Sequence, residues 1–224
     1  MENSDFRYEI KYNIPDIIDL QNFDYLKKIN FEEIYPPRVV NSIYFDNYNF
    51  DLYNDSILGH PNRLKYRVRW YDKTINKANL EIKRKIGSVG NKSKYRLVEC
   101  NFIKNQNIDL LIESINKSKI KDSIKQKIIS MRPILYCSYL RKYFLSIDGR
   151  FRITIDKNLI FSRTNDLSFK SLIRDNTSVL EIKFNESDYP ELEKVIYNFP
   201  FIRSRFSKYV RGINIIFKGN YKNY

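Results

Sequence analysis

The sequence is organised around Arg63-Leu64-Lys65-Tyr66-Arg67-Val68-Arg69-Trp70-Tyr71, in which every second side chain is cationic and most of those between are apolar. Side chains of a β-strand alternate between two faces, so this stretch predicts a strand with four positive charges on one face. Two later runs, 80–86 and 92–99, repeat the pattern with Glu81, Lys83 and Lys85, and with Lys92, Lys94 and Arg96. Adjacent strands of this kind form a cationic wall, and the repulsion within it implies an anionic ligand.

The composition predicts one domain over residues 1–224. The 224 residues are 42% hydrophobic, and a chain of this length buries roughly 70% of its unfolded surface. Lys and Arg number 40 against 26 Asp and Glu, a net charge of +14. This excess predicts attraction to polyanions: nucleic acid, an acidic membrane or polyphosphorylated small molecules.

The compartment is expected to be the cytoplasm. The N-terminus has no apolar segment typical of a signal peptide, and no run approaches the roughly 18 apolar residues that span a bilayer. Cys100 and Cys137 have no metal-binding or disulfide spacing, which is typical of a reducing environment. The sequence leaves the oligomeric state open.

Periodicity predicts about eight strands, mainly antiparallel, with helices between them. Strands are expected at 6–12, 39–45, 63–71, 80–86, 92–99, 134–147, 150–156, 159–162 and 178–184. Helices are expected at 15–29, at 108–131 with a break near Ser118, after Pro190 and from Phe206 onward, whereas 46–62 is expected to be a connection. Asp148-Gly149 predicts a two-residue hairpin turn, with Arg150 and Arg152 on one face of the strand that follows.

The expected fold is α+β, an antiparallel eight-stranded β-barrel tunnel with flanking helices. Closing the strands into a barrel turns the charged faces inward and leaves apolar faces for the helices to cover. The alternative is an ordinary sheet whose basic face lies in solvent.

Nine motifs in order resemble a known family. They are Glu9-Ile-Lys11-Tyr12, Ser42-Ile-Tyr44-Phe45-Asp46, Lys65-Tyr-Arg67-Val-Arg69-Trp-Tyr71, Leu80-Glu-Ile-Lys83-Arg-Lys85, Lys94-Tyr-Arg96, Tyr139-Leu-Arg141-Lys-Tyr143, Arg152-Ile-Thr-Ile-Asp156, Leu180-Glu181-Ile-Lys183 and Phe206-Ser207-Lys208-Tyr209. Together they resemble the VTC domain of polyphosphate polymerases, a branch of the CYTH-like triphosphate tunnel metalloenzymes. The superfamily's opening motif Glu-x-Glu-x-Lys is Arg7-x-Glu9-x-Lys11 here, which removes one candidate metal ligand and favours the VTC branch.

The resemblance implies a tunnel in which basic side chains hold a triphosphate and a carboxylate holds Mg²⁺ or Mn²⁺. The implied catalytic residues are Arg67, Arg69, Lys94 and Arg152. The implied phosphate-binding residues are Lys11, Lys83, Lys85, Arg96, Arg141, Lys183, Ser207 and Lys208, with Lys83 and Lys85 competing for one place. The implied metal ligand is Glu181, with Glu9 as a second candidate.

Several residues have simpler interpretations. Glu9, Glu81 and Glu99 each have cationic neighbours, so internal ion pairs are expected of them. His60 is expected on the surface, and Tyr139 in ordinary packing. Truncating Arg67, Arg69, Arg141 or Arg152 is expected to weaken triphosphate binding and to leave stability equal or higher, because clustered like charges repel.

The favoured function is an ATP-dependent polyphosphate polymerase, whose partners are ATP and polyphosphate. Phosphoryl transfer needs alignment and positive charge, and an anionic phosphate nucleophile needs no general base. One alternative is a metal-dependent tri- or polyphosphatase or nucleoside triphosphatase. The other is a non-catalytic module that binds polyphosphate or RNA, although nucleic acid is not the expected partner. The membrane spans and regulatory domains of some VTC polymerases are not expected in this chain.

Overall fold

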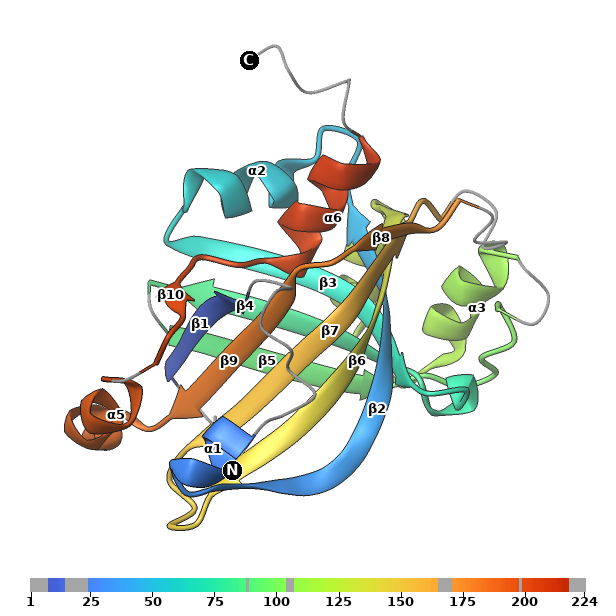
Figure 1. Ribbon diagram of the computed structural model, residues 1–224. Coiled ribbons are helices and arrows are strands. Elements are labelled where there is room, and N and C mark those ends of the chain that lie inside the picture. Colours follow the sequence, from blue (N-terminus) through green and yellow to red (C-terminus); the bar gives the residue numbers. More distant parts are fainter. Residues whose placement is uncertain are drawn as a thin grey trace. The chain divides into compact units, whose positions relative to one another are not determined.

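The computed structural model describes residues 8–14, 24–87, 89–103, 107–164, 171–197 and 199–217. Its strands are β1 (Tyr8–Ile14), β2 (Phe31–Asp46), β3 (Asn62–Tyr71), β4 (Asn79–Ile86), β5 (Val89–Arg96), β6 (Arg132–Ser146), β7 (Arg152–Ser162), β8 (Ile173–Asp175), β9 (Ser178–Phe184) and β10 (Ile202–Arg203) (Figure 1). Its α-helices are α1 (Asp24–Lys28), α2 (Asp51–Leu58), α3 (Asp109–Lys117), α4 (Asp122–Ile129), α5 (Tyr189–Ile196) and α6 (Lys208–Ile216). Two short 3₁₀ turns, Ile75–Lys77 and Glu186–Asp188, precede β4 and α5.

The hydrogen-bonded order of the strands is β10-β1-β9-β7-β6-β2-β3-β4-β5, with β8 beside β7. The pairings β1–β9, β9–β7, β2–β3, β3–β4 and β4–β5 are all antiparallel. The predicted antiparallel sheet with flanking helices is therefore confirmed. The predicted count of eight and the closed barrel are wrong for the described residues, which form ten strands in an order that does not return from β5 to β10.

Backbone contacts divide the chain into two compact units. Unit 1 comprises Met1–Arg38, Tyr139–Leu159 and Asp175–Phe206, and unit 2 comprises Val39–Ser138, Ile160–Arg174 and Ser207–Tyr224. Strands β2, β6 and β7 each contribute residues to both units. The prediction of a single domain over 1–224 stays a prediction.

In unit 1, period-two alternation separates an apolar face from a charged one. Ile10, Tyr12 and Ile14 of β1 are buried with Leu180 and Ile182 of β9 in one hydrophobic cluster. Leu26 of α1 and Leu192 of α5 belong to the same cluster, so these two short helices cover the apolar face. Alternate residues of the same strands, which include Glu9, Lys11 and Glu181, point to the opposite face.

Unit 2 follows the same principle. Tyr66, Val68 and Trp70 of β3 are buried, and the Trp70 ring packs against Phe102 and Tyr136. The cationic residues of β3 alternate with this apolar set. Helix α6 packs beside α2 (Figure 1) and approaches strands closely at Gly212. A Cβ at Gly212 would lie 2.6 Å from Phe161 and 2.7 Å from Leu135, so a larger residue would push the helix outward.

Most predicted elements are present, with shifted ends. The predicted break near Ser118 is confirmed, since α3 ends at Lys117 and α4 begins at Asp122. The hairpin around Asp148-Gly149 is present, but its connection is longer than the predicted two residues, because β6 ends at Ser146 and β7 begins at Arg152. The predicted helix 15–29 is described only from residue 24, and its earlier part lies outside the described residues.

Three predictions about elements are wrong, and two short strands were not predicted. Residues 46–62 contain α2. Residues 159–162 belong to β7, which continues through Asn158 although the φ of that residue is 53°, a left-handed value that is unusual within a strand. Strands β8 and β10 have three and two residues, too few for a periodic signal. Arg150 lies in the turn before β7 and not on the strand face of Arg152.

Candidate functional site

The first charged surface lies in unit 2, on β3, β4 and β5. Cross-strand pairing places its side chains in three rows, Lys65–Lys83–Lys92, Arg67–Glu81–Lys94 and Arg69–Asn79–Arg96. We call this set, with the Arg63–Lys85 pair at its end, the β3–β5 basic face. It carries nine cationic side chains and one carboxylate.

Glu81 is the anionic centre of the β3–β5 basic face. Its side chain is 3% exposed and accepts hydrogen bonds from Arg67 Nε at 2.9 Å and Nη2 at 2.7 Å. Arg69 Nη1 lies 3.8 Å and Lys92 Nζ 3.5 Å from its carboxylate. Burial alone would raise the pKa of Glu81, but the attraction of these cations outweighs it and lowers the pKa to about 2.

Arg67 and Arg69 each donate a hydrogen bond to a side chain of β2. Arg67 Nη1 donates to Tyr44 Oη at 3.2 Å, and Arg69 Nε donates to Ser42 Oγ at 3.1 Å. Both acceptors project from β2, whose register places Tyr44 opposite Arg67 and Ser42 opposite Arg69. Burial and the nearby Arg67 and Arg69 also lower the pKa of Lys92 in spite of Glu81. One carboxylate therefore does not neutralise this face.

The start of α6 joins the β3–β5 basic face through Lys65. Lys65 Nζ donates to Ser207 Oγ at 2.9 Å, and the same oxygen caps the helix by accepting from the Val210 amide at 3.3 Å. Two residues later, Tyr209 Oη donates to the fully buried carboxylate of Asp46. Burial and the adjacent Asp46 carboxylate raise the pKa of Tyr209, which keeps its proton on the phenol.

Asp46 also organises α2. Its carboxylate accepts from the backbone amides of Asn47 at 2.8 Å, Leu52 at 3.1 Å and Tyr53 at 3.0 Å. Burial raises the pKa of Asp46, and these hydrogen bonds together with that from Tyr209 limit the rise. One buried side chain thus links the end of β2 to the first turns of both α2 and α6.

The second charged surface lies in unit 1, on β1, β9 and β7, three strands that lie side by side in Figure 1. Its rows are Lys11–Glu181–Thr154 and Glu9–Lys183–Arg152, and we call it the β1–β9–β7 face. Lys11 Nζ lies 3.4 Å from Glu9 and 3.6 Å from Glu181, whose other oxygen is 2.9 Å from Lys183 Nζ. Burial would lower the pKa of Lys11, but Glu181 and Glu9 outweigh this effect and raise it.

Arg141 and Asp156 form a buried fork beside this face in unit 1. Arg141 Nε and Nη2 donate to the two carboxylate oxygens of Asp156 at 2.5 and 2.7 Å, and the guanidinium lies over the Tyr139 ring. Although burial opposes the charge of Arg141, Asp156 raises the pKa of Arg141 well above its usual value. Asp156 is 1% exposed, so the pair is both desolvated and bidentate.

The residues implied by the resemblance divide between the two surfaces. Arg67, Arg69, Lys83, Lys85, Lys94 and Arg96 lie on the β3–β5 basic face, with Ser207 and Lys208 at the adjoining start of α6. Lys11, Arg141, Arg152, Lys183, Glu9 and Glu181 belong to unit 1. Arg96 stands at the margin, where its Nη2 donates to the Asn76 carbonyl oxygen at 2.9 Å.

The simpler interpretations are mostly correct. Glu9 and Glu81 are ion-pair partners of lysine and arginine, and Tyr139 is buried. Glu99 is paired with Lys117 at 2.6 Å, but its side chain is 61% exposed, so the expectation of an internal pair is wrong. His60 is half exposed and paired with Asp55.

Some contributors were not identified from the sequence as site residues. Lys65 and Lys92 complete a row of three lysines, and their strand parity with Arg67 and Lys94 was the available signal. Asp46, Ser42 and Tyr44 act through contacts that no local pattern indicates.

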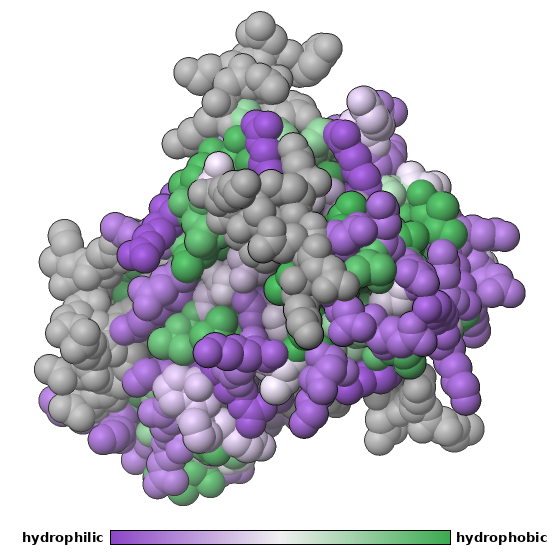
Figure 2. Space-filling view, turned by 90° about the vertical axis from the view of Figure 1, so that its right-hand side faces the viewer, coloured by the Kyte–Doolittle hydropathy of each residue, from purple (hydrophilic) through white to green (hydrophobic). Residues whose placement is uncertain are grey.

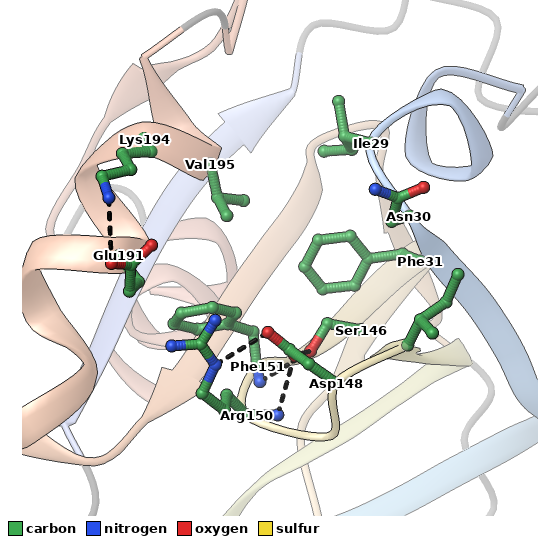
Figure 3. A pocket seen from close by; sticks show the side chains of 11 residues that line it. Ile29, Asn30, Phe31, Ser146, Asp148, Arg150, Phe151, Glu191, Lys194 and Val195 are labelled. Atoms are coloured by element: carbon green, nitrogen blue, oxygen red, sulfur yellow. Dashed lines mark hydrogen bonds and ion pairs between the residues drawn. The ribbon is translucent and has the colours of Figure 1, made fainter.

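A groove of about 530 Å³ lies elsewhere in unit 1 (Figure 3). Ile29, Phe31, Phe151 and Val195 line it with the ion pairs Asp148–Arg150 and Glu191–Lys194. No residue of either charged surface lines this groove.

The sequence-family model of the VTC domain matches residues 6–217 of this chain. The chain belongs to the VTC domain family. It is 25% identical over 165 residues to vacuolar transporter chaperone complex subunit 2 of Schizosaccharomyces pombe, an alignment that covers 66% of this chain and 22% of that protein. The chain therefore spans about a fifth of the length of this curated relative.

Solved structures share the fold of this VTC domain. A protein from Pyrococcus horikoshii OT3 has a TM-score of 0.52 and 14% identity, covering 92% of this chain and 97% of that chain. A structure described as a putative adenylate cyclase from Vibrio parahaemolyticus has a TM-score of 0.52 and 13% identity, covering 90% and 94%. Among the helices described in this VTC domain, none has the length and hydropathy needed to span a bilayer.

The donors of the β1–β9–β7 face suit the divalent cation that the resemblance implies. Within the described residues, no group of three or more His, Cys, Asp and Glu side chains gathers as a metal site. Mg²⁺ is commonly bound by one or two carboxylates together with substrate phosphates and water. Glu9 and Glu181, both near Lys11, supply two such carboxylates, and the Thr154 hydroxyl across from Glu181 is buried without a hydrogen-bond partner.

Proposed function

We propose that this VTC domain is an ATP-dependent polyphosphate polymerase, which transfers the γ-phosphate of ATP to the end of a growing polyphosphate chain. The observation that carries the proposal is the β3–β5 basic face, with nine cations around one carboxylate. Figure 2 shows hydrophilic side chains, in purple, beside hydrophobic ones, in green, on the face that it draws. The net charge of the chain is +14. A polyanion longer than one triphosphate suits such an excess.

Phosphoryl transfer requires positive charge around the transferred group and alignment of the nucleophile with it. The loose transition state of phosphoryl transfer spreads negative charge over the oxygens of the moving group. Arg67 and Arg69 are oriented by Tyr44, Ser42 and Glu81, so their guanidinium groups are held in place for binding phosphate with little reorganisation. Lys94 lies opposite Glu81 and adds a third charge. We assign catalytic roles to these three residues and to Arg152.

The remaining cations bind and orient phosphate oxygens in this proposal. Their assigned roles follow their places in the rows: Lys83, Lys85 and Arg96 on the β3–β5 basic face, Ser207 and Lys208 at the start of α6, and Lys11, Arg141 and Lys183 in unit 1. Lys83 is favoured over Lys85, because its row contains lysines on both neighbouring strands whereas Lys85 pairs with Gly90 on β5.

Glu181, with Glu9, would hold Mg²⁺ or Mn²⁺. When bound, the cation neutralises phosphate charge and polarises the transferred phosphoryl group. Lys11 and Lys183 keep Glu181 in place through their ion pairs. A terminal phosphate of the growing chain is already anionic, so the proposal requires no general base for the nucleophile.

The test is incubation of the pure chain with ATP and Mn²⁺, followed by separation of long polyphosphate from orthophosphate. We expect ADP and chains that lengthen with time, and a shorter lag when short polyphosphate is added. Arg67→Ala should abolish chain growth. Arg84→Ala is the matched control, because Arg84 lies on the other face of β4, where its Nε donates to Asn62.

Two results would refute the polymerase assignment in different ways. Stoichiometric orthophosphate without chains at any metal concentration would identify a triphosphatase. Salt-sensitive polyphosphate binding with no turnover and no metal dependence would identify a binding module. The cytoplasmic location expected from the sequence also stays a prediction, which imaging of a fluorescently tagged chain can check.

A further inference from the structure

Two buried hydroxyl groups in the described part of the chain have no hydrogen-bond partner. They are Thr154 Oγ1 and Thr164 Oγ1, on residues that are 5% and 2% exposed. Burying a hydroxyl without a partner is unfavourable, because the group gives up hydrogen bonds to water and gains none in return. Such a group in a native structure requires an explanation, and a missing ligand is one of them.

Thr154 stands among the charges of the β1–β9–β7 face. It is the cross-strand partner of Glu181, which is itself the cross-strand partner of Lys11. Cross-strand partners project to the same face with Cβ atoms about 5 Å apart. Arg152 and Asp156 precede and follow Thr154 on the same face of β7. The hydroxyl therefore lies in the row of the carboxylate that is the candidate metal ligand.

The charged groups around Thr154 already have partners in this structure. Glu181 is paired with Lys11 and Lys183, and Asp156 accepts hydrogen bonds from Nε and Nη2 of Arg141. None of these groups forms a hydrogen bond with Thr154. A ligand that enters beside Glu181 would supply the missing partner.

We propose that Thr154 Oγ1 accepts a hydrogen bond from a water molecule of a hydrated divalent cation held by Glu181. The proposal rests on the proposed function in taking Glu181 as the residue that holds the cation. Mg²⁺ and Mn²⁺ prefer oxygen ligands, and Mg²⁺ usually keeps several waters, each of which is a strong donor. A phosphate oxygen would instead be drawn to the adjacent row, where Arg152 lies opposite Lys183.

The structure offers a matched pair of variants. Thr154→Val removes the hydroxyl with nearly the same shape, and Thr164→Val makes the same change at the other unpartnered hydroxyl, which belongs to neither row of this face. Both variants should unfold at the same temperature as the wild type or higher when metal is absent. Thr154→Ser should behave as wild type, because it keeps the hydroxyl.

The experiment is titration of the wild type and each variant with Mn²⁺ alone, with free Mn²⁺ followed by electron paramagnetic resonance. We expect Thr154→Val to lose about tenfold or more in Mn²⁺ affinity, the usual effect of removing a partner that supports a metal site. Thr154→Ser and Thr164→Val should retain wild-type affinity, and Glu181→Gln should lose it. Thr154→Ala repeats the measurement if the valine variant does not fold.

Equal Mn²⁺ affinity in Thr154→Val and wild type would overturn the proposal, as would a wild type that binds no Mn²⁺. The proposal would also be overturned if Thr154→Val lost as much affinity for inorganic triphosphate in EDTA as it loses for Mn²⁺. The hydroxyl would then bind a phosphate oxygen. None of these measurements uses ATP turnover. A chain that binds Mn²⁺ through Thr154 but makes no polyphosphate would refute the polymerase and leave this inference standing.

Discussion

At the scale of single residues, buried carboxylates determine which cations can be removed without loss of stability. Arg67 neutralises Glu81, and Arg141 neutralises Asp156, whose side chains are 3% and 1% exposed. Removing Arg67 leaves Glu81 with the longer contacts to Arg69 at 3.8 Å and Lys92 at 3.5 Å, and removing Arg141 takes two hydrogen bonds from Asp156. Each change leaves a poorly solvated carboxylate with less compensation. The expectation that truncating any of the four arginines leaves stability equal or higher is therefore not supported for these two.

Arg141→Ala and Arg152→Ala should differ in stability. Arg141→Ala should cost about 3 kcal/mol of unfolding free energy, because it removes the bidentate cation that compensates the buried Asp156 carboxylate. Arg152→Ala should be close to neutral, because Arg152 lies opposite Lys183 and its removal relieves repulsion. Urea unfolding measures both, and both should weaken triphosphate binding.

The double variant Arg141→Ala/Asp156→Asn provides the control. It should recover part of the stability that Arg141→Ala loses, because the side chain that Arg141 compensates is then neutral as well. If Arg141→Ala proves as stable as wild type, the Asp156 carboxylate is not desolvated in the way described.

The depressed pKa of Glu81 predicts that the unfolding free energy of unit 2 falls at acid pH. Its pKa is about 2 in the folded chain against an ordinary value of 4.5, a difference equivalent to about 3 kcal/mol. Because the folded pKa is depressed, this stabilisation is fully present above pH 4.5 and is lost as the pH falls towards 2. The difference in unfolding free energy between wild type and Glu81→Gln should therefore shrink across this window.

The control for acid sensitivity is Glu113→Gln. Glu113 lies on the surface, where its side chain is 52% exposed and pairs with Lys117. Surface pairs contribute little to stability, so its free-energy difference from wild type should stay small at every pH. A Glu81→Gln difference that stays constant from pH 5 to pH 2 would contradict the depressed pKa.

At the scale of elements, Tyr209 anchors the first turn of α6 to the end of β2. Its hydroxyl donates to Asp46, and its ring stacks on Tyr44 with centroids 5.2 Å apart. Tyr209→Phe keeps the ring and leaves the buried Asp46 carboxylate with one donor fewer, which should cost about 1 to 3 kcal/mol. It should also weaken triphosphate binding, because Ser207 and Lys65 are then held less firmly.

Tyr53→Phe is the matched control for Tyr209→Phe. It removes a hydroxyl that donates to Asn214, further along the same helix. Stability should fall in both variants, but triphosphate affinity measured by calorimetry should fall only in Tyr209→Phe. An equal loss of affinity would show that α6 acts as a rigid unit and that its first turn has no special role.

The same region shows what could be predicted from the sequence. Alternation in Arg63–Tyr71 correctly predicted a strand with a cationic face, because period-two burial is a local property. Helix α2 was missed because no side chain of its own caps it; its first amides donate to Asp46 and Asn47. Strand β10 was missed because two residues show no period, and it exists only through pairing with β1.

The site was predictable to a similar extent. Residue types and their alternation along each strand identified the cations, but the sequence alone does not show which carboxylate faces which arginine. The pairing of Arg67 with Glu81 follows from the β3–β4 register, and that of Arg141 with Asp156 from contacts between β6 and β7. The unpartnered hydroxyl of Thr154 lies opposite Glu181 because of the β7–β9 register.

At the scale of the whole molecule, the two units are not separate in the sequence. Each is assembled from three segments, and β2, β6 and β7 pass from one unit to the other within a single strand. A strand cannot be paired over half its length and unpaired over the rest without exposing backbone donors and acceptors. The units should therefore unfold together.

The measurement is thermal unfolding followed by two probes. The single tryptophan, Trp70, reports on unit 2 through its fluorescence, and far-ultraviolet circular dichroism reports on both units. The two curves should coincide, as they do for a two-state transition. A fluorescence transition that precedes or follows the other by several degrees would show that the units melt independently.

The shared strands also bear on how this chain reaches its native state. Neither unit can be completed until residues up to Phe206 for unit 1, or the segment from Ser207 for unit 2, have left the ribosome. Contacts between residues so distant in sequence slow folding, because long loops must close before the contacts form. The nascent chain therefore carries unpaired strands through most of its synthesis, and it should depend on protection from aggregation until α6 is released.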